Sequence, residues 1–360
     1  MKKIVLTKKV KQNLTTYAIV IITYIIVQIL IAAGLMSYQL QGLLVPVCTY
    51  VILAISLNLT VGILGELSLG HAGFMCIGSF LGASFSICMT GIIELSLLRF
   101  ILSLLVGAVS AGIIGFLIGL PVLRLKGDYL AIVTLAFGEI IKNIVNLIYF
   151  GYDSKGFHFT MNDFQDLNIE EDGVIVIKGA QGVTGTPQDA TFTIGVILIL
   201  ITVFIILHLI QSRDGRAIMS IRDNQIAAES LGINITKYKL MAFTISAALA
   251  GMAGALYAHN YNNVKATTNN FGYNMSIMIL VFVVLGGIGN IRGSIIAATI
   301  LTLLPEVLRF MSQYRMLVYA IVLILMMLFN WSPKAQAWKA RFKAKWKSKF
   351  AIPKSTKEEQ

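Results

Sequence analysis

Long apolar runs, separated by short polar segments, form the main pattern of this 360-residue sequence. Runs of about 20 apolar residues are long enough to cross a bilayer as helices. They are continuous rather than alternating, so the pattern excludes a membrane β-barrel. The predicted spans lie near residues 17–36, 43–64, 67–90, 98–121, 129–150, 191–210, 240–258, 276–287, 294–309 and 316–331.

The apolar region 275–304 is interrupted by a glycine-rich run, GGIGNIRG at 286–293. Each glycine costs a helix about 1 kcal/mol relative to alanine, so this run predicts a turn between two shorter helices. Both ends of the chain are basic, which predicts cytoplasmic N- and C-termini and an even number of crossings. We therefore expect an all-α polytopic integral membrane protein with about ten transmembrane or re-entrant helices.

A second glycine-rich run, GILGELSLG at 62–70, is similar to the run at 286–293. Two interpretations are open. The similarity reflects an internal duplication, in which glycine-interrupted spans of the two halves mark a transport pathway. Alternatively, two glycine-rich runs resemble each other by chance.

The polar segments predict the organisation outside the membrane. Residues 1–16 and 332–360 form basic cytoplasmic tails around a membrane domain at 17–331. The loop 151–190 has seven acidic residues against two lysines, which predicts an extracytoplasmic position. Within that loop the run GVIVIK at 173–178 predicts a short strand. The polar loop 211–239 is flanked by basic residues and is predicted to be cytoplasmic.

Composition agrees with this class, since 57% of residues are hydrophobic and 13% are charged. The net charge of +12 comes from the tails and short loops, so it indicates topology and a lipid bilayer as partner, with no nucleic acid. The three cysteines have no metal-ligand spacing. No catalytic triad or phosphate-binding loop is apparent in the sequence, so we expect no catalytic residue, no metal and no cofactor bound by this chain.

A short helix is predicted within the cytoplasmic loop. Asp223 or Asn224 can cap its first turn, and Gly232 can end it in the left-handed conformation. The predicted helix, 225–231, presents Ala227 and Ala228 as a flat surface. It either docks into a groove on a soluble partner or connects two spans along the bilayer surface.

Polar residues inside the spans are candidates for the transport pathway. Glu139, Lys142, Asn143 and Asn146 share one face of a predicted helix, and Glu139 lies about 16 Å from its start at 1.5 Å per residue. A charge at that depth must face the bundle interior, and Glu139 is expected to pair with Lys142. The four residues either line a pathway or lock helices together. Further candidates are Asn58, Ser68 and His71, and for His71 the alternative is a structural role near a helix end.

Several long stretches resemble one family. They are 57–80 (LNLTVGILGELSLGHAGFMCIGSF), 123–145 (LRLKGDYLAIVTLAFGEIIKNIV), 179–187 (GAQGVTGTP), 216–258 (RAIMSIRDNQIAAESLGINITKYKLMAFTISAALAGMAGALYA) and 279–309 (ILVFVVLGGIGNIRGSIIAATILTLLPEVLR). Together they make the region from about 51 to 330 similar to the LivM-type permease subunits of the bacterial branched-chain amino acid ABC importer family. The departures are mild: Gln225 stands where an acidic residue is frequent, and Ser230-Leu231 where a small residue and Met are common.

The resemblance implies a subunit of an ATP-driven importer in the bacterial plasma membrane, and not an enzyme. Its implied partners are a second, LivH-like permease, two ATP-binding subunits that hold the ATP, and an extracytoplasmic solute-binding protein. The implied solute is a branched-chain or related amino acid. The same resemblance implies that the residues in contact with the ATPase are Arg222, Gln225, Ala227, Ala228, Glu229 and Gly232. The alternatives are a self-contained secondary transporter or channel, or a relative that imports urea or amides.

Overall fold

The computed structural model describes residues 8–125, 127–162, 164–167, 169, 173–311 and 314–331. The predicted C-terminal tail and the first seven residues of the N-terminal tail lie outside these residues. The chain divides into two compact units, Met1–Leu303 and Leu304–Gln360. In the second unit, the short helix η4 (Leu308–Met311) is followed by helix α13 (Arg315–Trp331).

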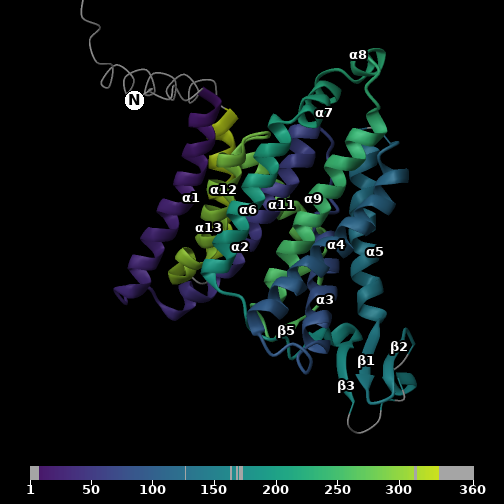
Figure 1. Cartoon of the computed structure of the whole chain (residues 1–360). Helices are drawn as coiled ribbons and strands as arrows, with labels where there is room; N and C mark the ends of the chain where they lie inside the picture. The colour runs from purple at the N-terminus through teal and green to yellow at the C-terminus, as the bar shows by residue number, and fades with distance from the viewer. Residues whose placement is uncertain are drawn as a thin grey trace, which may run out of the picture. The chain divides into compact units, whose positions relative to one another are not determined.

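Helices make up most of the first unit (Figure 1). Eight helices or continuous helical segments among the described residues are long and apolar enough to cross a membrane. This pattern defines a polytopic membrane protein. The α-helices before residue 308, including those too short to cross a membrane, are α1 (Lys8–Ala32), α2 (Tyr38–Asn58) with the π-helix η1 (Leu59–Leu64), α3 (His71–Cys88), α4 (Ser96–Val122), α5 (Asp128–Leu147), α6 (Phe192–Gln211), α7 (Arg213–Asp223), α8 (Gln225–Ser230), α9 (Ile235–Ala258), α10 (Thr268–Phe271), α11 (Tyr273–Gly286) and α12 (Ile291–Val307).

Each of the ten predicted spans coincides with a helix, although several boundaries differ. The span predicted at 67–90 begins only at His71, because residues 65–70 are not helical. The span predicted at 129–150 ends at Leu147, where a strand follows. The predicted break is confirmed, since Gly287 and Gly289 adopt positive φ between α11 and α12. Helices α12 and α13 each have 17 residues and α11 has 14, fewer than the other spans.

Close packing of small residues holds α9 between α3 and α4. A Cβ added at Gly251 of α9 would lie 2.3 Å from both the Cβ of Ala111 and the carbonyl oxygen of Gly107 on α4. A Cβ at Gly78 of α3 would lie 2.0 Å from the carbonyl oxygen of Gly251. Small side chains are therefore required here, as is common where membrane helices cross closely.

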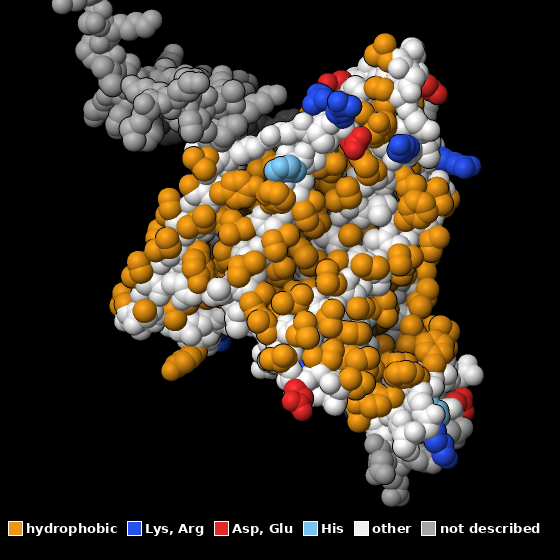
Figure 2. Space-filling view, viewed as in Figure 1, with side chains coloured by type: hydrophobic (Ala, Val, Ile, Leu, Met, Phe, Trp, Pro, Cys, Tyr) orange, Lys and Arg blue, Asp and Glu red, His pale blue; other side chains and the backbone are white. Residues whose placement is uncertain are grey.

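A small antiparallel sheet makes the all-α prediction too narrow. Its strand order is β2-β1-β3-β4-β5, and only β3 falls at the strand predicted within 173–178. The sheet lies at the opposite end of the helices from α8 (Figure 1). In Figure 2, hydrophobic side chains cover the flank of the helices, and charged side chains gather toward α7 and α8 and near the sheet. The strands are β1 (Tyr149–Asp153), β2 (Gly156–Thr160), β3 (Val174–Lys178), β4 (Val183–Thr184) and β5 (Asn263–Val264).

Candidate functional site

The loop between α6 and α9 folds into two short, capped helices. Ser212 caps α7 by accepting a hydrogen bond from the amide of Gly215 at 3.0 Å. Asn224 caps α8 in the same way, through the amide of Ala227 at 3.1 Å. Gly232 follows α8 at φ +79°. The predicted cap and stop of α8 are confirmed, whereas α7 was not predicted.

Helix α8 lies at one end of the helix bundle (Figure 1), and some of its apolar side chains are exposed to solvent. Ile226 is 79% exposed and Leu231 is 80% exposed, with Ala227 and Glu229 exposed between them. Ala228 is buried, so the predicted flat surface includes Ala227 but not Ala228. The exposed surface of α8 therefore combines two large apolar side chains with a small one and an acidic one.

Arg222, at the end of α7, points back toward the membrane helices. Its Nη1 donates to the carbonyl oxygen of Gly62 in η1 at 3.2 Å, and its Nη2 donates to Asp223 at 2.8 Å. A Cβ on Gly65 would lie 2.6 Å from Cγ of Arg222. The Arg222 side chain can therefore pack here only because residue 65 is a glycine. Arg222 therefore connects the α7–α8 loop to the end of the second span.

A polar cleft of about 510 Å³ separates α8 from η1 and α9. An ion pair between Lys239 and Glu66 lies on its wall, and Lys239 also donates to Oε1 of Gln225 at 3.4 Å. The lining residues are Leu64, Gly65, Glu66, Ile221, Arg222, Asp223, Asn224, Gln225, Ile226, Glu229 and Lys239.

The two glycine-rich runs contact each other directly beneath this cleft. A Cβ added at Gly62 would lie 2.3 Å from the amide nitrogen of Gly289. Buried Asn58 joins the same two segments, because its Oδ1 accepts from the Gly289 amide at 2.8 Å and its Nδ2 donates to Ser294 at 2.9 Å. Asn58 was predicted in the pathway, and the structure places it between α2 and the α11–α12 turn.

The residues 65–70 lead back into the helix bundle to His71. The His71 ring is buried, and its Nε2 lies 2.7 Å from Oγ of Ser56. The next amide, that of Ala72, donates to Oγ of Ser276 at 3.2 Å. Ser68 is also buried, and its hydroxyl has no hydrogen-bond partner among the described residues.

The polar stripe on α5 binds that helix to the segment before α11. Glu139 and Lys142 form the predicted ion pair. Glu139 also accepts from the amide of Tyr273 at 2.7 Å, and Lys142 donates to Thr268 at 3.1 Å. Asn146 donates to the carbonyl oxygen of Ala266 at 3.0 Å.

Asn143 departs from the rest of the stripe. Its side chain is exposed in the single chain, so the expectation that all four residues face the bundle interior is wrong for Asn143. Glu139, Lys142 and Asn146 have the contacts of a lock between helices. Asn143 remains the member of the stripe that an outside partner can reach.

A buried charged cluster lies near the sheet and was not predicted. Arg99 at the start of α4 pairs with Asp189 at 3.3 Å. His259 is fully buried beside Phe100, with 4.8 Å between ring centroids, and its Nδ1 lies 2.9 Å from the carbonyl oxygen of Ala255. Burial lowers the pKa of His259, which favours the neutral ring.

The described residues contain no group of His, Cys, Asp and Glu side chains that could hold a metal ion. The three cysteines are free thiols: Cys48 and Cys76 are buried, and Cys88 is partly exposed. The site consists of an exposed, partly apolar tip at α8, a polar cleft and two helix breaks that contact each other.

These features define a class: a polytopic membrane protein whose helix breaks connect to an exposed loop between two spans. The sequence pattern of the family described as "Branched-chain amino acid transport system / permease component" matches residues 39–329. The chain belongs to this family.

Individual relatives agree with the family match. The chain is 35% identical over 302 residues to the high-affinity branched-chain amino acid transport system permease protein LivM of Salmonella typhimurium, covering 79% of this chain and 67% of LivM. LivM of Escherichia coli is also 35% identical, over 294 residues and the same shares. A probable branched-chain amino acid transport permease protein, LivH of Methanocaldococcus jannaschii, is 26% identical over 268 residues, or 73% of this chain and 78% of that protein. No solved structure matches the chain.

Proposed function

We propose that the chain is the transmembrane permease subunit of an ATP-driven importer for branched-chain or related amino acids. The similarity to two LivM proteins supports the solute class. The observation that carries the mechanism is the exposed α8, connected through Arg222 to the end of the second span. The proposed location is the bacterial plasma membrane, which the eight membrane-length helical segments support.

The proposed partners follow from the similarity to the LivM and LivH permeases, and the exposed surface of α8 supports one of the contacts. Two ATP-binding subunits supply the energy, and one of them contacts α8 through Gln225, Ile226, Ala227, Glu229 and Leu231. A second, LivH-like permease completes the pathway, and an extracytoplasmic binding protein delivers the solute. The chain itself acts as a transporter subunit and not as an enzyme.

The proposed topology places the α7–α8 loop and both basic tails in the cytoplasm, with the sheet outside. Supporting this orientation, the α7–α9 region carries Arg213, Arg216, Arg222, Lys237 and Lys239. The membrane domain is proposed to span 17–331, with the coupling loop at 211–239 and the outer loop at 151–190. An internal duplication is supported by the direct contact of the two glycine-rich runs, each of which follows a helix and contains a glycine with positive φ.

Coupling is proposed to run from α8 through Arg222 to the helix breaks. A movement of the α7–α8 loop pulls on the Gly62 carbonyl, because Arg222 is hydrogen-bonded to it. Gly62 packs against Gly289, so the same movement reaches the α11–α12 turn. The π-helix η1 is a suitable element to move, since π-helical segments occur most often at functional sites.

The pathway is proposed to run between the two permeases, past α5. Asn143 supports this position because an amide exposed at membrane depth needs water or a protein partner rather than lipid. Among the other pathway candidates, Ser68 has an unpaired buried hydroxyl, and His71 and Asn58 stabilise the helix breaks behind it.

The test is uptake by the reconstituted complete importer with Ala227 replaced. Ala227→Trp enlarges the exposed surface of α8 and should lower ATP-driven uptake about tenfold, while membrane insertion is unchanged. Ala33→Trp makes the same change at an exposed turn after α1 and should have no effect.

Normal uptake and normal ATP hydrolysis in Ala227→Trp would contradict the role of α8. Uptake by the purified subunit alone, driven by an ion gradient without any ATPase, would contradict the importer itself. Binding measurements on the partner solute-binding protein would separately identify whether the solute is an amino acid, urea or another amide.

A further inference from the structure

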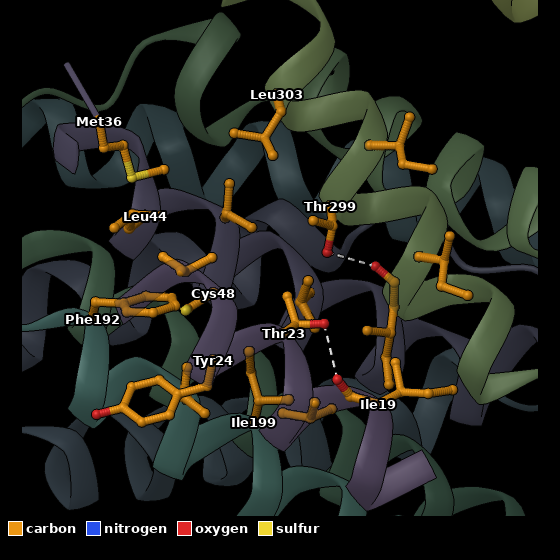
Figure 3. Close-up of a pocket in the computed structure, with 18 residues that line it drawn as sticks. Ile19, Thr23, Tyr24, Met36, Leu44, Cys48, Phe192, Ile199, Thr299 and Leu303 are labelled. Atoms are coloured by element: carbon orange, nitrogen blue, oxygen red, sulfur yellow. Dashed lines mark hydrogen bonds between the residues drawn. The ribbon is translucent and has the colours of Figure 1, made fainter. Parts of the chain in front are cut away.

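A second cavity lies far from the coupling loop, between α1, α2, α6 and α12 (Figure 3). Its volume is about 290 Å³. Of these helices, α1, α2 and α6 have the length and composition of membrane spans. Eighteen side chains line the cavity, and none of them is charged.

The few polar groups in the wall are already occupied. Thr23 donates to the carbonyl oxygen of Ile19 at 2.9 Å, and Thr299 donates to that of Ile295 at 2.8 Å, as Figure 3 shows. The hydroxyl of Tyr24 lies 3.1 Å from that of Thr193. The cavity wall is therefore almost entirely apolar, and its threonine hydroxyls direct their protons to carbonyl oxygens of their own helices.

Polar tethers hold α1 in place on both sides of the cavity. Toward the start of α1, Thr16 accepts a hydrogen bond from Nε of Arg292 on α12 at 2.7 Å. Toward its end, Gln28 donates to Tyr24 at 3.2 Å and to Thr193 at 3.5 Å. The residues of α1 that line the cavity lie between these tethers, from Ile19 to Val27. The space is thus bounded by specific contacts rather than left by loose packing.

An empty or water-filled cavity of this kind is unfavourable. Its lining loses van der Waals contacts when nothing fills it, and water needs two to four polar partners that this wall lacks. An apolar cavity of about 150 Å³ takes up a molecule as large as benzene, so this one has room for a longer hydrocarbon. The bilayer supplies hydrocarbon directly, because Ile22, Ile25 and Ile29 of α1 are exposed beside it.

We propose that the cavity binds one acyl chain of a membrane phospholipid, with the headgroup outside it. This acyl chain packs between α1 and α12. It contacts α2 at Cys48 and Val51, which precede Asn58 on the same helix. Lipid binding here is independent of the transport function proposed above.

The test uses the complete importer in phospholipid vesicles that contain a phosphatidylethanolamine with a photoreactive diazirine in one acyl chain. After illumination, mass spectrometry of the peptides should locate lipid adducts on cavity residues, with Thr23 and Cys48 among them. Val196→Trp fills the cavity with an indole ring and should reduce these adducts about tenfold, since packed interiors exclude a second occupant. Val196→Phe is the smaller variant if the first does not fold.

The matched control is Ile197→Trp, one residue along α6, where the side chain is 48% exposed and does not line the cavity. It should leave the cavity adducts unchanged. Equal labelling of the cavity in Val196→Trp and Ile197→Trp would overturn the proposal. Cavity labelling in the isolated subunit that disappears in the complete importer would also overturn it, because a partner helix would then be the occupant.

Discussion

The two glycine-rich runs have similar sequences but different surroundings. The first, at 62–70, continues from a π-helix into six non-helical residues and then returns to the bundle at His71. The second, at 286–293, is a tight turn between α11 and α12, and Ile288 at its tip is 58% exposed. Both interrupt a helix near the same point, because Gly62 and Gly289 are in contact.

Contacts with the α7–α9 region distinguish the first run from the second, whose Arg292 donates to Thr16 of α1 instead. Glu66 pairs with Lys239, and the carbonyl oxygen of Gly62 accepts from Arg222. Both anchors belong to the α7–α9 region, whereas Asn58 joins the second run to the first. Under the proposed coupling mechanism, the first run would therefore receive movement from the α7–α8 loop, and the second run would follow it.

The largest effect on stability is expected when an anchor of the first run is removed. Lys239→Met leaves the Glu66 carboxylate without its partner in a site where Lys239 is 4% exposed. We expect a loss of about 3 kcal/mol in unfolding free energy, because the remaining charge is poorly solvated. Equilibrium unfolding of the purified protein in mixed micelles measures this change.

Two further variants make the anchor experiment specific. Lys237→Met removes an exposed lysine from the same turn of α9 and should change stability by less than about 0.5 kcal/mol. Adding Glu66→Gln to Lys239→Met should recover most of the loss, since no unpaired charge remains. If the double variant is as unstable as Lys239→Met alone, the unpaired Glu66 charge is not the cause of the stability loss.

A smaller effect is expected from adding a methyl group at the contact between the runs. Gly62→Ala would place a Cβ 2.0 Å from Oδ1 of Asn58 and should cost about 2 kcal/mol through overpacking. Gly289→Ala meets no atom closer than 3.4 Å, but its φ of +78° disfavours alanine, at a cost of about 1 kcal/mol. Thermal unfolding of both variants checks the order, and equal losses would show that the close approach at Gly62 costs no more than the backbone strain at Gly289.

Local signals explain what the sequence could predict. An apolar run of span length, the Asn224 cap and the glycines after α11 each depend on neighbouring residues only. Helix α7 also had a local signal, since Ser212 precedes buried positions at Gly215, Ile218 and Ile221, but the polar residues between them obscured it.

Contacts between distant segments explain what the sequence could not predict. Strand β5 has two residues and pairs with β4, about 80 residues earlier. A segment this short has no hydrophobic pattern of its own that would predict a strand. The bond from Arg222 to Gly62 joins residues 160 positions apart. The candidate residues could therefore be named in advance, but the direction in which Arg222 and Asn143 point could not.

Removing the Asn58 side chain that connects the two runs is expected to cost less than the added methyl group at Gly62. Asn58→Leu removes the hydrogen bonds to the Gly289 amide and to Ser294 and should cost about 1 kcal/mol. Asn290→Leu changes the same residue type on the exposed turn and should cost less. Hydrogen exchange should then show faster exchange at residues 287–291 in Asn58→Leu alone. Unchanged exchange there would mean that glycine packing, and not Asn58, holds the second run in place.

The smallest effect on stability, combined with a clear effect on function, is expected at Arg222. The side chain is about one-third exposed, so Arg222→Ala should cost less than about 1 kcal/mol. Because the link from α7 to Gly62 is lost, ATP hydrolysis should continue while solute uptake per ATP falls about fivefold, at the low end of typical coupling energies. Arg216 is an exposed arginine on the same helix whose Nη1 donates to the carbonyl oxygen of Gln211 at 3.2 Å, so Arg216→Ala is the control and should keep the normal ratio. An equal loss in both variants would assign the effect to the positive charge of the loop, and the two glycine-rich runs would then differ only in shape.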